Sequence, residues 1–158
     1  PYTTLFRSKI GVINVLGHVF MDVDKNPFIR IKEVVRSIAR ETSIIFVDVH
    51  AEATSEKVAM GWFLDGLVSC VYGTHTHVQT ADERVLPHGT GYITDIGMTG
   101  PFQSIIGREI EPVLKRFSTS MPARFNVATD DVRLSGAIVR VDCTTGKALS
   151  IERFQKNA

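Results

Sequence analysis

The sequence has little of what marks out several large classes of protein. It contains 2 cysteines in 158 residues, Cys70 inside an apolar run and Cys143 in a turn-rich stretch. That spacing is typical of neither a metal-binding nor a redox pair, so we expect two reduced thiols and a cytoplasmic setting. No apolar run approaches the length that crosses a bilayer. The sequence therefore predicts neither a disulfide scaffold nor a membrane protein.

An excess of charge of one sign is also lacking. The 18 basic residues balance 17 acidic ones and are scattered along the chain. We therefore expect no binding to duplex nucleic acid or to a membrane surface. The printed sequence contains no GxGxxG, GxxxxGK or GxSxG motif, so it predicts no dinucleotide fold, P-loop or serine-hydrolase elbow. Any phosphate must be held in another way.

What is present is the composition of one folded domain. The hydrophobic share of 44% and the charged share of 22% are close to globular averages, and 158 residues suit a single core. The first 8 residues, PYTTLFRS, stand apart, because they back-translate into a common sequencing-library adaptor. We expect residues 1–8 to be a non-native leader and residues 9–158 to be the protein domain.

Apolar runs and amphipathic stretches alternate along the first half of the chain. Three runs rich in β-branched residues predict buried strands at 9–16, 44–50 and 67–72, the second covered on both faces. Between them, the apolar spacing predicts one helix through 31–38 and another over 55–66. The order of strand, helix, strand, helix and strand indicates a layered α/β protein.

The remaining local signals complete this outline. Ser55 is the expected N-cap of the second helix, and Met60 is expected to face the core. Further along, the pattern predicts an antiparallel or mixed sheet and one more helix, in whose first turn Pro112 is tolerable. These elements are expected at 92–95, 124–127, 137–141 and 148–154 for the strands and at 109–117 for the helix.

Three of the histidines follow predicted strands. His50 closes the strand at 44–50, and His75 and His77 come soon after the strand at 67–72. In an extended segment, side chains two residues apart point the same way, and the carboxyl ends of strands in layered α/β folds gather ligands. Since imidazole is a common metal ligand, the pattern predicts a metal site. The alternative is that each ring is an ordinary hydrogen-bonded loop side chain.

Polar residues near these histidines have two interpretations each. Asp48 and Glu52 are placed to orient a ring from behind, or else to serve as a strand-end hydrogen bond and a helix-entry charge. Asp95 and Thr99 belong to TDIGMTGP, which either lines a pocket or forms a tight structural loop. The remaining histidines are expected to be surface or structural residues: His18 and His88.

The two histidine segments also resemble a known family. Residues 48–57 read DVHAEATSEK and residues 73–83 read GTHTHVQTADE. Together with the later runs SIIG, VLKRF and PARFNVA, they are similar to the YmdB-type bacterial calcineurin-like metallophosphoesterases, which include phosphodiesterases acting on 2',3'-cyclic AMP. The likeness runs from about Lys9 to Phe154. It implies an enzyme with a small phosphodiester substrate, and an α/β fold that is part of a four-layer α-β-β-α sandwich.

The resemblance also implies roles and absences. His50 and His75 would ligate one divalent ion and His77 the other, in a two-metal site for Mn, Fe or Zn. The family's other ligands and its catalytic histidine, in a GNH motif, precede the matching segment, and no GNH occurs here. We therefore expect the C-terminal part of the enzyme only, with its N-terminal strands and helices missing, no catalytic residue of its own and impaired or absent activity.

Two other functions stay open at this point. One is a non-catalytic metal-binding or assembly module, in which the three histidines hold one structural ion. The other is a capsule-synthesis type of metallophosphoesterase-like protein, which the family-specific runs TSEK and VQTADE disfavour. Whatever the function, apolar residues of this chain that would face the missing strands are expected to be exposed, which predicts a homo-oligomer or poor solubility.

Overall fold

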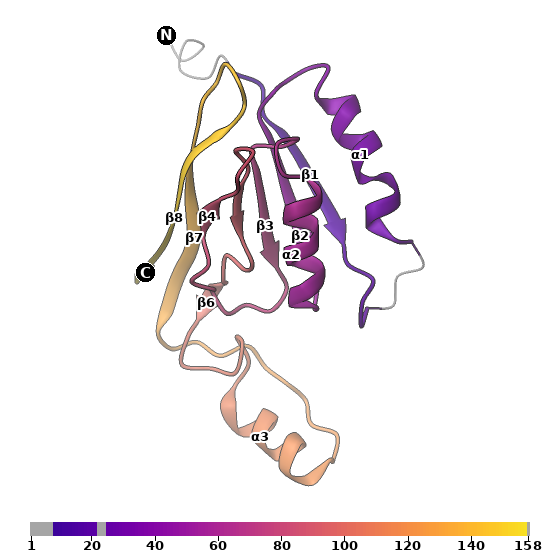
Figure 1. Cartoon of the computed structure of the whole chain (residues 1–158). Helices are drawn as coiled ribbons and strands as arrows, with labels where there is room; N and C mark the ends of the chain where they lie inside the picture. Colours follow the sequence, from indigo (N-terminus) through magenta and orange to yellow (C-terminus); the bar gives the residue numbers. More distant parts are fainter. Residues whose placement is uncertain (1–7, 22–24, 158) are drawn as a thin grey trace.

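The computed structural model describes residues 8–21 and 25–157. The expected leader, residues 1–8, lies outside these ranges except for Ser8. The described part is a mixed α/β protein built on two sheets, which confirms the predicted class (Figure 1). None of its helices is long and apolar enough to cross a membrane.

A 5-stranded sheet forms the centre of the molecule, with the strand order β1-β2-β3-β5-β4. The first four strands in that order are parallel, and β4 is antiparallel to β5. Because β1, β2 and β3 run the same way, all three end at one edge of the sheet. The bounds are Gly11–Leu16 for β1, Ile45–His50 for β2, Cys70–Thr74 for β3, Arg84–Val85 for β4 and Gly91–Ile93 for β5.

Two helices cover one face of this sheet (Figure 1). Helix α1 spans Pro27–Ile38 and helix α2 spans Thr54–Phe63. Met60 is fully buried against the sheet, as predicted, and packs in one apolar cluster with Val47 and Val49 of β2. Alternation along the strand turns the even-numbered residues of β2 to the opposite face, where they are only half-buried. The prediction that β2 is covered on both faces therefore holds in part, because Phe46 packs against an apolar cluster on this second face, whereas Asp48 and His50 are only half-buried.

The start of α2 also differs from the prediction. Ser55 is not the N-cap, because the helix begins at Thr54 and its N-cap is Ala53, which makes no side-chain cap hydrogen bond. The buried carboxylate of Glu56 is in the first helical turn and binds backbone N–H groups of the loop after β1 instead. In this helix the first turn is thus used to hold a neighbouring loop.

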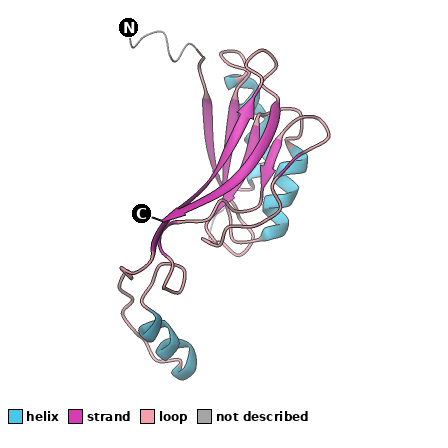
Figure 2. Cartoon of the chain, turned by 90° about the vertical axis from the view of Figure 1, so that its left-hand side faces the viewer, coloured by secondary structure: helices cyan, strands magenta, loops and turns pink. Residues whose placement is uncertain are grey.

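A second, 3-stranded antiparallel sheet lies against the other face of the central sheet (Figure 2). Its strands are β6 (Thr99–Pro101), β7 (Val132–Val141) and β8 (Ala148–Asn157). The order of helices, sheet and sheet matches three successive layers of the expected α-β-β-α arrangement. The strand predicted at 124–127 was wrong, because this segment runs exposed along the molecule and makes one isolated bridge, between Val127 and Arg108.

An arm formed by residues 102–131 leaves the body between β6 and β7 (Figure 1). It carries helix α3, Ile110–Thr119, which projects away from both sheets in two perpendicular views (Figures 1 and 2). Val113 is the buried residue of this helix. Pro112 sits in its first turn, where the missing N–H costs nothing, as the sequence predicted.

Strand β1 is the open edge of the central sheet. The prediction that it is a buried strand holds for one face only: Ile13 is 7% exposed, whereas Val12 is 66% and Leu16 is 47% exposed. Beside it, a groove of about 640 Å³ runs between β1 and α1.

We expect Gly73→Ala to be strongly destabilising, because a Cβ at this position of β3 would lie 1.8 Å from the carbonyl oxygen of Thr94 and 2.7 Å from Lys57 Cδ. The first of these is backbone and cannot move without separating strands, so we expect a loss of about 3 kcal/mol or more. Urea unfolding measures it. The matched control is Gly100→Ala, where a Cβ meets nothing within 4 Å; a similar cost at both glycines would contradict this account.

Candidate metal centre

Polar side chains form a chain of contacts across the ends of β1, β2 and β3. Asn14 Nδ2 donates to Asp48 Oδ2 at 2.9 Å, and Thr74 Oγ1 donates to Asp48 Oδ1 at 2.8 Å. The strand register places Asn14 beside Asp48 and Thr74 beside His50. All four side chains project from the face opposite the helices, because they share strand parity. Asp48 and His50 therefore lie together on one face, as their spacing predicted.

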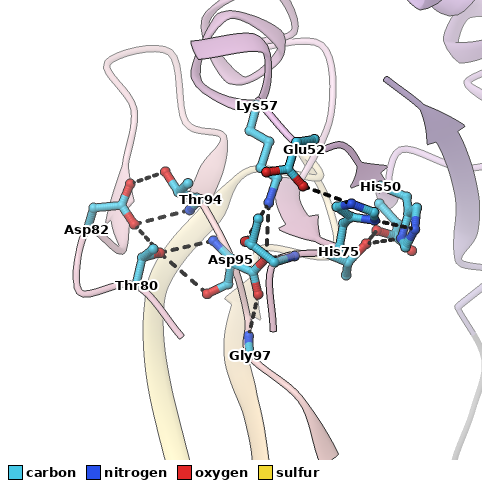
Figure 3. A network of polar contacts seen from close by, with 12 residues as sticks. His50, Glu52, Lys57, His75, Thr80, Asp82, Thr94, Asp95 and Gly97 are labelled. Atoms are coloured by element: carbon cyan, nitrogen blue, oxygen red, sulfur yellow. Dashed lines mark hydrogen bonds and ion pairs between the residues drawn. The ribbon is translucent and has the colours of Figure 1, made fainter. Parts of the chain in front are cut away.

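His50 and His75 meet at this edge of the sheet (Figure 3). Their rings are perpendicular, with centroids 4.8 Å apart and an interplanar angle of 86°. The closest atoms are His50 Nε2 and His75 Nδ1, which are 3.1 Å apart. Glu52 completes the group, with its Oε2 3.0 Å from His75 Nε2. Four residues that the sequence singled out, Asp48, His50, Glu52 and His75, thus belong to one connected network.

The hydrogen-bond partners of the two rings assign their tautomers when both imidazoles are neutral. The Thr74 hydroxyl gives its proton to Asp48, so its oxygen accepts the proton of His50 Nδ1 at 3.0 Å, which leaves a lone pair on His50 Nε2. Likewise, His75 donates from Nε2 to Glu52 and keeps a lone pair on Nδ1. These two lone pairs face each other. Such an arrangement is repulsive unless a proton or a metal ion lies between the rings.

The spacing of the two nitrogens suits a shared metal ion. Two imidazole nitrogens, each about 2.0–2.1 Å from one ion, are about 2.9 Å apart at a right angle and about 3.4 Å apart at a tetrahedral angle. The observed 3.1 Å falls within that range. Among residues 8–21 and 25–157, however, no three His, Cys, Asp or Glu side chains are grouped to hold an ion. The described residues thus fit part of a donor set, contributed by His50 and His75.

His77 does not join the network around His50 and contacts the arm instead. Strand β3 ends at Thr74, and His75 and His77 have positive φ values of 95° and 67°. The prediction of an extended segment was therefore wrong. The loop bends at these residues, in a backbone conformation that residues other than glycine rarely adopt. His77 Nδ1 donates to the carbonyl of Ile106 in the arm at 2.9 Å. Its ring lines a hollow of about 310 Å³, which Thr99 of β6 also lines.

The bend is held by a buried ion pair. Lys57 Nζ lies 3.0 Å from Asp95 Oδ2, and the two side chains are 1% and 0% exposed (Figure 3). Thr76, between the two loop histidines, donates to the same carboxylate oxygen from its hydroxyl at 2.6 Å and from its backbone N–H at 3.2 Å. Asp95 therefore lies beneath the histidine loop rather than along a pocket. Turning Thr76 inward is what turns His75 and His77 outward.

A second carboxylate supports the same loop from the other end. Asp82 accepts hydrogen bonds from the hydroxyls of Thr80 and Thr94, at 2.6 Å and 2.5 Å, and from the Thr94 N–H at 3.1 Å. Partial burial raises the pKa of Asp82, but these hydrogen bonds together outweigh burial and hold the pKa below its usual value. The Thr80 hydroxyl oxygen also accepts from the N–H of Asp95, which links the Asp82 carboxylate to the backbone of Asp95.

Sequence reasoning missed Lys57, although a signal was present. Lys57 lies on the same helical stripe as Met60, Gly61 and Leu64, all of them buried. A lysine on an apolar stripe needs a buried partner, and Asp95 is that partner.

The other histidines and the thiols have structural surroundings. His18 Nδ1 lies 2.8 Å from buried Glu56, and His88 Nδ1 lies 2.9 Å from Asp65. Burial raises the pKa of the Cys70 thiol to about 12, so that this cysteine is no nucleophile. These residues take no part in the network around His50.

Fold and site together define an α/β protein with paired imidazoles at the carboxyl edge of a parallel sheet. The sequence matches the YmdB-like protein family over residues 2–154, and the chain belongs to this family. It is 50% identical, over 156 residues, to the 2',3'-cyclic-nucleotide 2'-phosphodiesterase of Bacillus subtilis, a match that covers 99% of this chain and 59% of the relative. A putative phosphatase/phosphodiesterase of Mycoplasma pneumoniae is 40% identical, with 94% and 53% covered.

Solved structures agree with the fold. A hypothetical protein from Thermus thermophilus superposes with a TM-score of 0.85 at 40% identity, over 92% of this chain and 56% of that one. A structure described as a novel phosphatase from Mycoplasma pneumoniae gives 0.84 at 38% identity, over 92% and 53%. The chain thus spans between 53% and 59% of the length of these relatives.

We expect Asp95→Asn to cost about 3–5 kcal/mol of unfolding free energy, because it leaves the Lys57 ammonium buried without a counter-charge. Chemical denaturation measures the loss. Asp131→Asn is the matched control, since Asp131 pairs with Arg133 on the solvent-exposed surface, where water and salt screen an ion pair. Equal losses in the two variants would show that the buried ion pair contributes no more to stability than the exposed one.

Proposed function

We propose that this chain supplies one side of a two-metal phosphodiesterase site, in which His50 and His75 hold one divalent ion and His77 the other. The observation that carries the proposal is the close approach of His50 Nε2 and His75 Nδ1, which are 3.1 Å apart. Membership of the YmdB-like family supports it, as does the activity for which the Bacillus subtilis relative is named. By that likeness, the substrate class is a 2',3'-cyclic nucleotide.

Bound ions and the residues of the chain would supply different parts of the chemistry. When bound, divalent ions such as Mn, Fe or Zn neutralise the phosphoryl oxygens and activate a water for in-line attack at phosphorus. In the neutral rings, Asp48 directs the proton of His50 to Nδ1 through the Thr74 hydroxyl, and Glu52 directs the proton of His75 to Nε2. Carboxylates and hydroxyls in such positions orient ligand rings and raise their basicity.

The donor set of the described residues is incomplete for two ions. Two imidazoles converge, and His77 reaches towards the arm, yet two-metal sites hold their ions about 3.5–4 Å apart with bridging ligands. The proposal therefore assigns the remaining ligands and the leaving-group acid to residues beyond those described. A cytoplasmic setting is part of the proposal, since Cys70 and Cys143 are both free thiols.

A structural ion is the competing function. Structural zinc sites close four protein ligands and contribute directly to folding stability. Here the Lys57–Asp95 pair holds the histidine loop through Thr76, and the imidazoles take no part in these contacts. The catalytic proposal therefore expects chelation to leave the melting temperature nearly unchanged, whereas a structural ion requires a large fall.

We expect His50→Ala and His75→Ala each to weaken Mn²⁺ or Zn²⁺ binding by about 100-fold or more, since each removes one of the facing nitrogens. Glu52→Gln and Thr74→Val are expected to weaken binding by about 10-fold, because they loosen ring orientation. Isothermal titration calorimetry measures the affinities. His88→Ala is the control, since His88 is exposed and pairs with Asp65. Metal affinity unchanged in both His50→Ala and His75→Ala would refute the assignment.

We expect this 158-residue chain alone, with Mn²⁺, to hydrolyse 2',3'-cyclic AMP at least about 100-fold more slowly than the intact Bacillus subtilis relative, because an incomplete donor set cannot hold both ions. Product release followed by chromatography measures both rates. Equal turnover by the two proteins would show that the described residues already form a complete site.

A further inference from the structure

Helix α3 exposes a continuous apolar stripe. Ile110, Leu114 and Phe117 lie on one side of the helix, at spacings of four and three residues, with Met121 just beyond its end. Their exposures are 42%, 54%, 75% and 62%. Val113, on a neighbouring side, is the buried residue of the helix. A helix that projects from the molecule with such a stripe uncovered is typical of an interaction surface.

Charges along helix α3 are separated by sign. Glu109 and Glu111 lie at the start of α3, and Lys115, Arg116 and Arg124 lie along its second half and beyond. Within residues 8–21 and 25–157 none of these five side chains forms an ion pair. The acidic end also borders a hollow of about 430 Å³, lined in part by Glu109, Glu111 and Asp130.

We propose that α3 is a self-complementary docking surface for the α3 helix of a second copy of this chain. The two helices would pack antiparallel about a two-fold axis close to Leu114, which sets Ile110 of each copy against Phe117 of the other. Glu111 and Lys115 share the side of the helix next to the stripe, since they are four residues apart. Antiparallel packing brings Glu111 of each copy near Lys115 of the other.

A second copy fits this surface better than a lipid membrane does. Amphipathic helices that bind anionic membranes carry basic residues along both borders of the apolar stripe. Here the border includes Glu111, and the helix start carries Glu109 as well. Opposite charges at opposite ends are instead what a two-fold antiparallel partner requires. A stripe of three helical turns buries less area than a standard protein interface, so we expect a reversible, concentration-dependent dimer.

Sedimentation velocity of the whole chain over a range of concentrations tests the proposal. We expect Leu114→Glu to weaken dimerisation by about 100-fold or more, because it places two carboxylates at the centre of an apolar interface. Circular dichroism checks that the fold is kept. The matched control is Val12→Glu, since Val12 is 66% exposed on the open edge of β1. A dimer that Val12→Glu abolishes and Leu114→Glu leaves intact would place the interface on β1 and overturn the proposal.

A charge exchange tests the antiparallel arrangement itself. We expect Glu111→Lys and Lys115→Glu to weaken dimerisation by about 10-fold each at low salt, and the double exchange to restore it. No recovery in the double variant would contradict the two-fold pairing. Flotation with phosphatidylglycerol vesicles covers the other partner class: a monomer that binds vesicles through Leu114 would overturn the proposal. None of these measurements depends on phosphodiesterase activity, so the two proposals fail separately.

Discussion

The buried ion pair between Lys57 and Asp95 is the interaction on which the arrangement of the site depends. It joins helix α2 to the segment after β5, and its carboxylate also binds the hydroxyl and the N–H of Thr76. Replacing such a pair with apolar groups can cost little, but losing one partner leaves a charge stranded in the core. The pair therefore ties the path of the histidine loop to the packing of the core.

Close packing around Gly73 also ties the path of the histidine loop to the core. The Lys57 side chain reaches Asp95 by passing over β3 at the position where that strand has no side chain. A larger residue there would meet both the Lys57 stem and the carbonyl of Thr94 on the neighbouring segment. One missing methyl group thus permits both the tight approach of the strands and the passage of a lysine through an apolar layer.

Local patterns were enough to predict the helix-covered sheet and the face shared by Asp48 and His50. The β-branched runs predicted β2 to within one residue, because a strand packed under helices must be apolar on that side, whereas β3 begins three residues and ends two residues later than predicted. Strand parity then placed Asp48, His50 and Thr74 on one face. Family resemblance added the reason to regard these side chains as one site.

The bend after β3 could not be predicted from spacing, because it depends on a contact with Asp95, 19 residues away. Counting alternation past Thr74 assumed that the strand continues, which put the rings of His75 and His77 on one side. The exposure of one face of β1 could not be predicted from the sequence either. Its apolar residues have the same composition as those of a buried strand, and exposure depends on what lies beside the sheet.

The open edge of β1 has a consequence for communication within the molecule. The N–H groups of Gly11 and Gly17 donate to β2, so those of Val12, Asn14 and Leu16 point outward, where another strand can add. Asn14 also holds Asp48, which through Thr74 sets the proton on His50. Asn14 is therefore three hydrogen bonds from the imidazole, and a strand that joined this margin at Asn14 would act on the bonds that orient the ring without contacting it.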